Sequence, residues 1–573
     1  MSLQELRDDK IFTLMNNKRY FKYFGNMELQ LCYTRLRKTA LLISPTCKYP
    51  YLMESNKKIS KAAGTVSGMT LLSRIFGFLR DMVIAMAFGS SASADAFFVA
   101  FRIPNMQRRI LGEGAVTAAF IPVFTETLTQ KGESAAWKLT ANLFNILLVI
   151  LSAVSLLILV FSPAVITVFA PGFLDEPGKF ELTVKLTRWM APYLFFIGLA
   201  AFCMGILNSL KVFALPAAAP ILQNISMIVS VLVIAPLMDE PIMGLAIGVV
   251  VGGALQLLVQ LPTVFKKGMW LEMSFDFRQE EVVKIARLMG PVIFGLAVYE
   301  LNIMIDTLIA SMLPGGSISY LYYGNRLVQL PLGIFAVALS VALLPTLSSQ
   351  AAKGDLKELV KTIGFSIRLI LFITIPATIG LIILREPIIN TIWERGEFLT
   401  TTTEGTAIAL LYYSVGLCAY SGIKVIAPAF YSLQDTKTPA KIGIYAMVLN
   451  IVLNLILMKP LQHGGLALAT SIAAIFNVAM LIYHLRKRLG LMGGRKILRS
   501  TIKMFAASLA MGAATFVCRE SFFNVTDSIS IRLIALTACI TVGILVYALI
   551  SHYTKNEEWH FLLEMRKKKQ MPV

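Results

Sequence analysis

Two apolar segments near the start of the chain, residues 65–89 and 93–123, carry charged side chains where charge is costly. A bilayer core takes about 20 residues of apolar helix to cross, and an ionised side chain inside it is expensive unless it faces a partner or a wet cavity. Arginine is suited to phosphate because its guanidinium is planar, always charged and multidentate. The segments therefore predict a receptor for an anion, formed by Arg74, Arg80, Asp81, Arg102, Arg108, Arg109 and Glu113.

Helical geometry predicts which of these charged residues share a face of their helix. Arg74 and Arg80 lie about 120° apart with Gly77 midway, which predicts an open slot between two guanidinium groups. On the second segment, four residues within about 40° form a stripe of alternating sign, although Pro104 blurs this angle. The stripe consists of Asp95, Arg102, Arg109 and Glu113, with Arg108 beside it. The alternative is that the charges are buried pairs for helix packing, or snorkel at helix ends.

Composition places the chain among polytopic membrane proteins. It has 573 residues, of which 56% are hydrophobic and 15% charged. The net charge of +20 concentrates in short connections such as 486–488, which is the positive-inside pattern and does not indicate nucleic acid. The six cysteines lack metal or disulfide spacing. No Walker loop, nucleotide-binding domain or hydrolase triad is recognisable, so we expect a transporter and not an enzyme.

Apolar segments of spanning length follow one another from Lys57 onward. Basic residues follow the even-numbered segments, which predicts that both termini are cytoplasmic. The connection at 385–398 mixes arginine and glutamate and predicts a short amphipathic helix on the outer surface. Fourteen segments are predicted, at 65–89, 93–123, 137–164, 184–209, 216–238, 241–263, 285–313, 318–347, 360–384, 403–430, 438–459, 464–485, 498–518 and 530–552.

An internal repeat organises these segments. The pattern Ser-Leu followed by proline at 209–216 recurs at 432–439, a shift of 432 − 209 = 223 residues, and the apolar pair before proline at 120–122 recurs at 343–345 with the same shift. Each copy holds six spans, so both copies keep one orientation and an axis along the membrane normal relates them.

The predicted fold is therefore an all-α polytopic membrane protein with about 14 transmembrane helices. Two parallel six-helix lobes surround a central cavity, and rocking them would expose the cavity alternately to the two sides. In the second lobe Arg326 is the lone intramembrane charge of its segment, and it would meet the first-lobe arginines across the cavity. The predicted domains are a dispensable extension at 1–56, lobes at 57–268 and 269–490, and two further helices with a basic tail at 491–573.

A second candidate site lies in the second lobe. Asp306 lies well inside the seventh span, and Asn450 and Asn454 lie one turn apart on the eleventh. Thr470, on the twelfth, adds a hydroxyl, and the Leu466 carbonyl adds another oxygen. One carboxylate among neutral oxygens suits a monovalent cation such as Na⁺. The alternative is a protonated Asp306 that hydrogen-bonds the asparagines to hold helices together.

Four stretches resemble the MurJ (MviN) family, lipid II flippases of bacterial peptidoglycan synthesis within the multidrug/oligosaccharidyl-lipid/polysaccharide exporter superfamily. They are SRIFGFLRD (73–81), ADAFFVAFRIPNMQRRILGEGA (94–115), LYYGNRL (321–327) and YSVGLCAYSGIKVIAPAFYSLQDTKTP (413–439). The resemblance implies a flippase that moves lipid II from the cytoplasmic to the outer leaflet of the bacterial inner membrane. It also implies a groove for the lipid tail along the last two helices, with membrane lipids and cell-wall synthesis proteins as partners. The cavity residues that it implies are Arg74, Arg80, Arg108 and Arg326, with Asp95 and Glu113 as acids.

Two other functions stay open on the sequence. An exporter of a different undecaprenyl-pyrophosphate-linked oligosaccharide would need the same cationic cavity. A non-transporting scaffold of the cell-wall machinery would use the charges for helix packing. Delivery of lipid-linked precursor to the outer leaflet, measured after depletion of the protein, separates them.

We predict that deletion of residues 2–52 leaves function unchanged. The first span and the flanking Lys57, Lys58 and Lys61, which set its orientation, remain in the truncated chain. The measurement is growth of cells that carry the truncated chain as their sole copy, with membrane insertion checked by fractionation. Loss of insertion or growth would show that the extension is required.

Overall fold

The computed structural model describes residues 49–270 and 272–569, except for the side chains of 49–63, 111–113, 115, 117 and 565–569. The expected extension at 1–56 lies largely outside these residues and stays a prediction. The described chain divides into residues up to Met69 and residues from Thr70 onward, and all that follows concerns the second unit. The helices are α3 (Tyr49–Phe88), α4 (Ala92–Gln107), η4 (Arg108–Val116), α5 (Thr117–Gln130), α6 (Glu133–Phe169), η5 (Pro171–Asp175), α7 (Lys179–Ser209), α8 (Ala214–Val229), η6 (Ser230–Ile234), η7 (Ala235–Leu237), α9 (Pro241–Lys266), α10 (Glu280–Ser311), α11 (Ser317–Pro331), η8 (Leu332–Ala336), α12 (Val337–Ala352), α13 (Leu356–Ile383), α14 (Arg385–Ile392), α15 (Thr400–Val415), α16 (Leu417–Ser432), α17 (Lys437–Leu489), α18 (Gly494–Phe522), α19 (Ile529–Tyr553) and α20 (Glu557–Lys569).

The predicted fold class, an all-α polytopic membrane protein, is confirmed for the described part of the chain. Ten of its helices are long and apolar enough to span a membrane, or eleven if the bent pair α15 and α16, which meet at 43°, forms one span. The count of fourteen stays a prediction. Two predicted segments, 438–459 and 464–485, form the single assigned helix α17, which breaks at Gln462 (φ 49°, ψ −132°). The predicted short helix after α13 is present as α14.

The 223-residue repeat is visible in the backbone. Helices α7 and α16 end at equivalent positions, and each is followed by a non-glycine residue in the left-handed region, Lys211 (φ 62°) and Gln434 (φ 58°), where 434 − 211 = 223. The π-helix η4 interrupts the second predicted segment, and the π-helix η8 interrupts its counterpart. Such matching interruptions are expected when one helical unit has been duplicated. The exact lobe boundaries stay a prediction.

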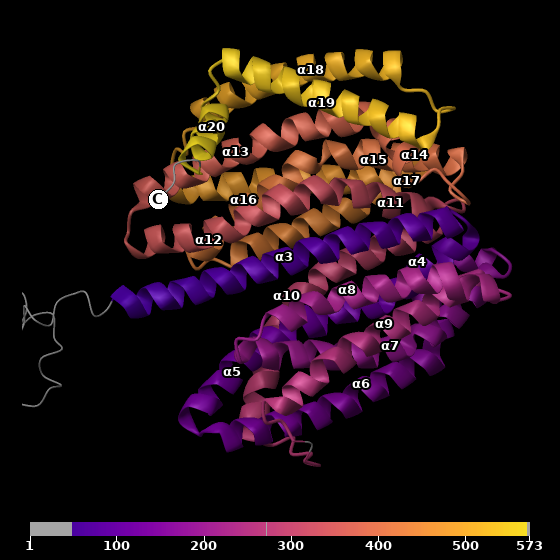
Figure 1. The fold of residues 1–573 in the computed structure, drawn as a ribbon, viewed down its shortest axis with the longest axis vertical. Coiled ribbons are helices and arrows are strands. Elements are labelled where there is room, and N and C mark those ends of the chain that lie inside the picture. Colours follow the sequence, from indigo (N-terminus) through magenta and orange to yellow (C-terminus); the bar gives the residue numbers. More distant parts are fainter. Residues whose placement is uncertain (1–48, 271, 570–573) are drawn as a thin grey trace, which may run out of the picture. The chain divides into compact units, whose positions relative to one another are not determined.

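Helix packing explains which elements can position the charges. In the first repeat, α7 packs against α4, α6 and α9 (Figure 1), and its buried face includes Phe202, which contacts Phe120 with ring centroids 4.8 Å apart. Helix α10 contacts η4, α5 and α17. It therefore meets the charged second segment and also contributes Asp306 to the candidate ion site.

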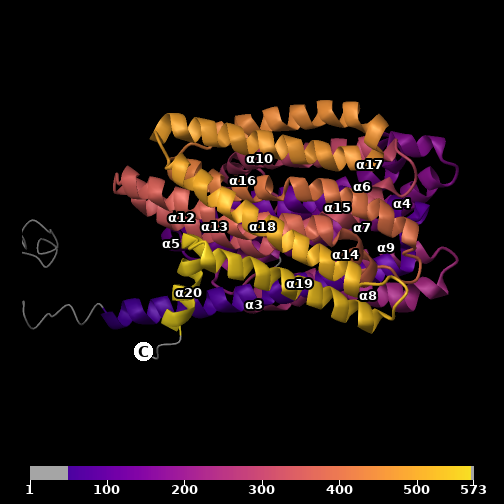
Figure 2. The same ribbon diagram turned by 90° about the horizontal axis from the view of Figure 1, so that it is seen from above.

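The last helices form a separate layer beside α13. Helices α18 and α19 lie side by side in both views (Figures 1 and 2), and α18 packs on α13. At one end of this layer the carboxylate of Glu558, on α20, is fully buried and accepts from Arg368 of α13 at 2.5 Å and from Ser500 of α18 at 3.0 Å. A buried charge is tolerated when it is paired in this way. The implied lipid-tail groove along these helices stays a prediction.

Candidate functional site: a paired arginine cluster between the repeats

A fully buried carboxylate, Asp81, lies at the centre of the charged cluster. Arg80 donates to Asp81 Oδ1 from Nε at 3.0 Å and from Nη2 at 2.6 Å. Arg326 of α11 donates from Nε to Asp81 Oδ2, and the Tyr322 hydroxyl donates to Oδ1 at 3.0 Å. One carboxylate therefore joins an arginine of the first repeat to the arginine of the second, as the sequence predicted for Arg80 and Arg326.

The expected open slot at Gly77 is wrong. Asn224, on α8, fills it: a Cβ on Gly77 would lie 3.6 Å from the Asn224 Nδ2. Asn224 accepts from Arg80 Nη1 at 3.0 Å and donates to the Ser73 carbonyl at 3.2 Å. A Cβ on Gly77 would make ordinary contact with Asn224, so the space beside the glycine is occupied and not open. Asn224 orients the Arg80 guanidinium, a role that no spacing within α3 could indicate.

Arg74 contacts the second repeat at another place. A Cβ on Gly333, in η8, would lie only 2.2 Å from Arg74 Nη1, so the guanidinium rests against glycine backbone. Arg74 is exposed, in contrast to the buried Arg80. The structure thus brings Arg74, Arg80 and Arg326 to the boundary between the repeats, with Arg74 the most accessible of the three.

The predicted stripe on the second segment meets the second repeat in antiparallel register. Arg102 donates to the Thr307 hydroxyl, and Arg109 pairs with the largely buried Glu300 at 3.4 Å. Arg109 lies seven residues after Arg102 on the second segment, and Glu300 lies seven residues before Thr307 on α10. Arg102 and Arg109 therefore contact the second repeat across the boundary, but Arg102 meets a neutral hydroxyl and the Arg109 side chain is 42% exposed, so neither forms a buried charge pair. Their predicted role in substrate binding is untested.

Asp95 lies at the other end of the contact between the repeats, and its side chain is buried. It pairs with Lys179 of α7 at 3.2 Å and accepts from the backbone N–H of Gly316 at 2.7 Å. The backbone N–H and the hydroxyl of Ser319 donate to its other oxygen at 2.9 and 2.6 Å. Asp95 therefore caps the first turn of α11, where an acid is favoured by the free N–H groups and the helix dipole.

The π-helix changes the geometry at the end of the stripe. Arg108 donates from Nε to Asn105 Oδ1 at 3.0 Å. From Arg108 to Val116 the backbone is a π-helix, whose wider turn moves the residues after it away from the angles of an ideal α-helix. The expectation of one straight helical stripe is therefore wrong beyond Gln107. The predicted role of Glu113 stays a prediction, because its side chain lies outside those that the structure describes.

The residues predicted for the candidate ion site lie together in the structure. Asn454 Nδ2 donates to Asp306 Oδ1 at 2.7 Å. The surroundings of the Asn450 amide favour the orientation in which its nitrogen also donates to Asp306 Oδ1, at 2.8 Å, and its oxygen accepts from the backbone N–H of Thr470 at 3.2 Å. The Thr470 hydroxyl donates to the Leu466 carbonyl at 2.9 Å. Asn454 Oδ1 is buried and has no hydrogen-bond partner among the described residues. The oxygens that a cation needs are thus together, although an amide nitrogen now bridges them.

This fold and this site define a membrane transporter built from two helical repeats that meet on buried, paired charges. The family described as lipid II flippase MurJ matches residues 84–537. The chain belongs to the MurJ family.

Its relatives match over nearly their whole length. The "Probable lipid II flippase MurJ" of Vibrio cholerae is 39% identical over 86% of this chain and 96% of its own. The "Lipid II flippase MurJ" of Burkholderia cenocepacia is 35% identical over 81% of this chain and 90% of its own. Among solved structures, "Lipid II flippase MurJ, inward closed conformation" is 29% identical with a TM-score of 0.72 and covers 86% of this chain and 99% of its own. An inward-facing multidrug MATE transporter, 13% identical with a TM-score of 0.63, covers 75% of this chain and 98% of its own and shows the fold alone.

We predict that Asp81→Asn destabilises the protein by about 3 kcal/mol, because it leaves two guanidinium groups beside each other without their shared counter-charge. Thermal unfolding of the purified protein in detergent measures the change. The control is Glu126→Gln, which breaks the exposed Glu126–Lys284 pair and should cost less than about 1 kcal/mol. Equal effects of the two substitutions would show that Asp81 does not hold the cluster together.

Proposed function

We propose that this chain moves lipid II across the membrane and binds its pyrophosphate at Arg74, Arg80 and Arg326. The observation that carries the proposal is that arginines from both repeats converge on one carboxylate at the boundary between the repeats. The Arg80–Asp81–Arg326 group carries one net positive charge, and Arg74 adds a second. A pyrophosphate esterified at both ends carries two negative charges, so the cluster and the substrate balance.

The pairing with Asp81 prepares the arginines for this anion. Each guanidinium has five N–H donors, and the contacts to Asp81 use only some of them. The remaining donors of Arg326 and the accessible guanidinium of Arg74 can meet phosphate oxygens while Asp81 and Asn224 keep Arg80 in place. Preorganised donors bind without first being reordered, which lowers the free-energy cost of binding. Arg102, Arg108, Arg109, Asp95 and Glu113 then act along the path of the headgroup and in the contact between the repeats.

Contacts near Asp95 support alternating access as the mechanism. The turn after α3 touches the segment after α14 so closely that a Cβ on Gly89 would lie 2.1 Å from the Glu397 carbonyl oxygen. The hydroxyls of Ser90 and Thr402 lie 2.7 Å apart. These contacts and the Asp95 cap hold the two repeats together at the end that the charge pattern predicts to be external. The proposed state is therefore closed on the outer side. Release of lipid II to that side requires these contacts to break.

We further propose that the chain lies in the bacterial inner membrane with both termini in the cytoplasm. Membrane lipids surround it, and cell-wall synthesis proteins are proposed partners. If delivery of lipid II were normal without this chain, while another undecaprenyl-pyrophosphate oligosaccharide failed to appear outside, the substrate would be that oligosaccharide. Normal delivery of every such lipid would favour a scaffold.

We also propose that Na⁺ binds in the second repeat, held by Asp306, Asn450, Asn454 and Thr470. The donors fit a hard monovalent cation, since one carboxylate lies among amide and hydroxyl oxygens. The unpartnered Asn454 Oδ1 supports this reading, because rotation of that amide would turn an oxygen toward Asp306 and Asn450 in place of the nitrogen. A bound cation would supply a positive charge that neutralises the Asp306 carboxylate.

We predict that Arg74→Ala, Arg80→Ala and Arg326→Ala each abolish transport without loss of membrane insertion. Each removes a phosphate donor, and Arg80→Ala or Arg326→Ala still leaves Asp81 one arginine partner. Lysine at 74 or 80 should restore transport only to about a tenth, because charge is kept but the bidentate fork is lost. Complementation by the variant as sole copy, together with lipid II accessibility at the outer leaflet, measures this. Lys138→Ala, on the exposed start of α6, is the matched control. Wild-type growth with an alanine variant at native expression would contradict a role for that arginine.

We predict that Na⁺ raises the melting temperature of the purified protein and that Asp306→Asn removes this rise. The carboxylate is the only charged ligand proposed, so its loss should weaken cation binding most. Choline at equal ionic strength is the control for salt. An identical melting curve in sodium and in choline would leave only the helix-packing role for the Asp306 cluster.

A further inference from the structure

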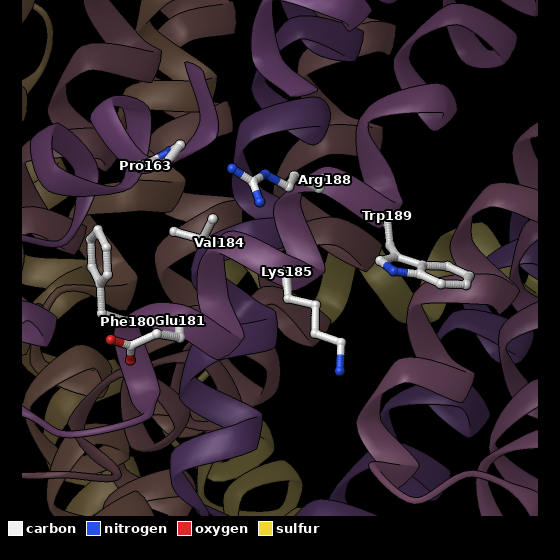
Figure 3. A pocket seen from close by; sticks show the side chains of 7 residues that line it. All are labelled: Pro163, Phe180, Glu181, Val184, Lys185, Arg188 and Trp189. Atoms are coloured by element: carbon white, nitrogen blue, oxygen red, sulfur yellow. The ribbon is translucent and has the colours of Figure 1, made fainter. Parts of the chain in front are cut away.

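Two hollows lie along the seam between α6 and α7, in a part of the first repeat that the proposed transport site does not use. The first has a volume of about 490 Å³ and is lined by charged and aromatic side chains of α7 with Pro163 of α6 (Figure 3). The second, of about 310 Å³, is lined by residues 152–159 of α6 and 192–196 of α7. The lining residues of the second hollow continue those of the first along both helices, from 180–189 to 192–196 on α7 and from Pro163 back to 152–159 on α6, so the two hollows lie one after the other and form one groove.

The first hollow is polar, and its arginine is held in position. Arg188 donates from Nε to the fully buried Ser162 hydroxyl at 2.8 Å, which fixes the plane of the guanidinium. Lys185 is paired with Glu240 at 2.7 Å, and Figure 3 shows its ammonium turned away from Arg188. Glu181 lies two helical turns before Arg188 on the same face of α7. The hollow therefore presents one oriented cation and, farther toward the helix start, one carboxylate.

The second hollow is apolar. Its walls include Leu156, Leu159, Phe195 and Phe196. The hydroxyl of Ser155 is used between the helices, where it donates to the Ala191 carbonyl at 2.6 Å. Leu156 and Leu159 are apolar and exposed, as expected of a surface that faces lipid. The groove thus changes from charged to apolar along its length, as an amphiphile does.

The dimensions fit one leaflet. From Glu181 to Phe196 the helix rises about 22 Å, and half of a bilayer including its headgroup layer is also about 20–22 Å. Trp189 lines the polar hollow and is 49% exposed, in the position typical of an aromatic residue at the membrane interface. The polar hollow therefore lies at headgroup depth, and the apolar hollow lies among the acyl chains.

We propose that this groove binds a zwitterionic glycerophospholipid whose headgroup ends in a primary ammonium. Arg188 holds the phosphate, Glu181 holds the ammonium, and an acyl chain follows Phe195 and Phe196. The order is right, because Glu181 is nearer the start of α7 and the ammonium of such a lipid lies farther from the tails than its phosphate. The charges also balance, since Lys185 is already paired with Glu240. An anionic headgroup would face Glu181 without a counter-charge.

The test uses full-length protein stripped of lipid in detergent and titrated with dioleoyl-phosphatidylethanolamine or dioleoyl-phosphatidylglycerol. Bound lipid is counted by native mass spectrometry, and protection is measured by thermal unfolding. Wild type should prefer the ethanolamine lipid. Arg188→Gln should weaken its binding about tenfold through loss of a charge-assisted phosphate contact. Glu181→Gln should keep phosphate binding but remove the preference between the two lipids.

Two further variants keep the outcome interpretable. Arg499→Gln, at an exposed arginine of α18, is the matched control and should bind as wild type does. Leu159→Trp fills the apolar hollow without touching a charge and should also weaken binding. Undiminished binding in folded Arg188→Gln or in Leu159→Trp would overturn the site. A wild-type preference for the glycerol lipid would overturn the headgroup assignment.

Discussion

An ionised carboxylate with no exposed surface survives inside a membrane protein only if its charge is compensated nearby, and Asp81 is compensated by arginines from two different repeats. This constraint determines much of the surrounding structure. Tyr322 and Asn224 are oriented by it, since the first donates to Asp81 and the second accepts from Arg80. A state in which the repeats separate at this point must supply another partner for Asp81 or another anion for Arg326. The pyrophosphate of the proposed function would be such an anion, and its binding would then be linked to the position of the repeats.

The seam between the second predicted segment and α10 shows a different use of charge. Here Arg102 meets Thr307 and Arg109 meets Glu300. Asp95, nearer the start of α4, meets Lys179 of α7 and the first turn of α11. Individual pairs of this kind contribute little net stability, because desolvation offsets much of their attraction. They do specify register, since a shift of one turn would leave several buried groups unpaired at once. The seam is therefore suited to closing in a single arrangement and to opening as a unit.

The lipid-facing groove and the cluster between the repeats have opposite requirements. In the proposed function the central arginines hold a headgroup that is later released, which agrees with donors that are shared with Asp81 and stay partly accessible. Arg188 is exposed on the surface proposed to face lipid, and its Nε donates to a single neutral hydroxyl of α6. Both proposals use arginine for phosphate, but only the first draws its donors from two repeats. Only the first can therefore change when the repeats move.

The sequence by itself determined the class of the protein, the repeat and the residue types of the site. Apolar segment lengths and the cost of charge in lipid are local properties, and they singled out Arg74, Arg80 and Arg326 without any structure. The 223-residue shift predicted equivalent helix ends, which appear at Lys211 and Gln434. Only the tertiary structure decided what each charge meets. Asn224 fills the space at Gly77, Asp95 caps a helix of the other repeat, and a π-helix interrupts the expected stripe. Spacing defines the angle of a side chain about its own helix, whereas its partner comes from a helix more than a hundred residues away, whose position depends on the packing of the whole chain.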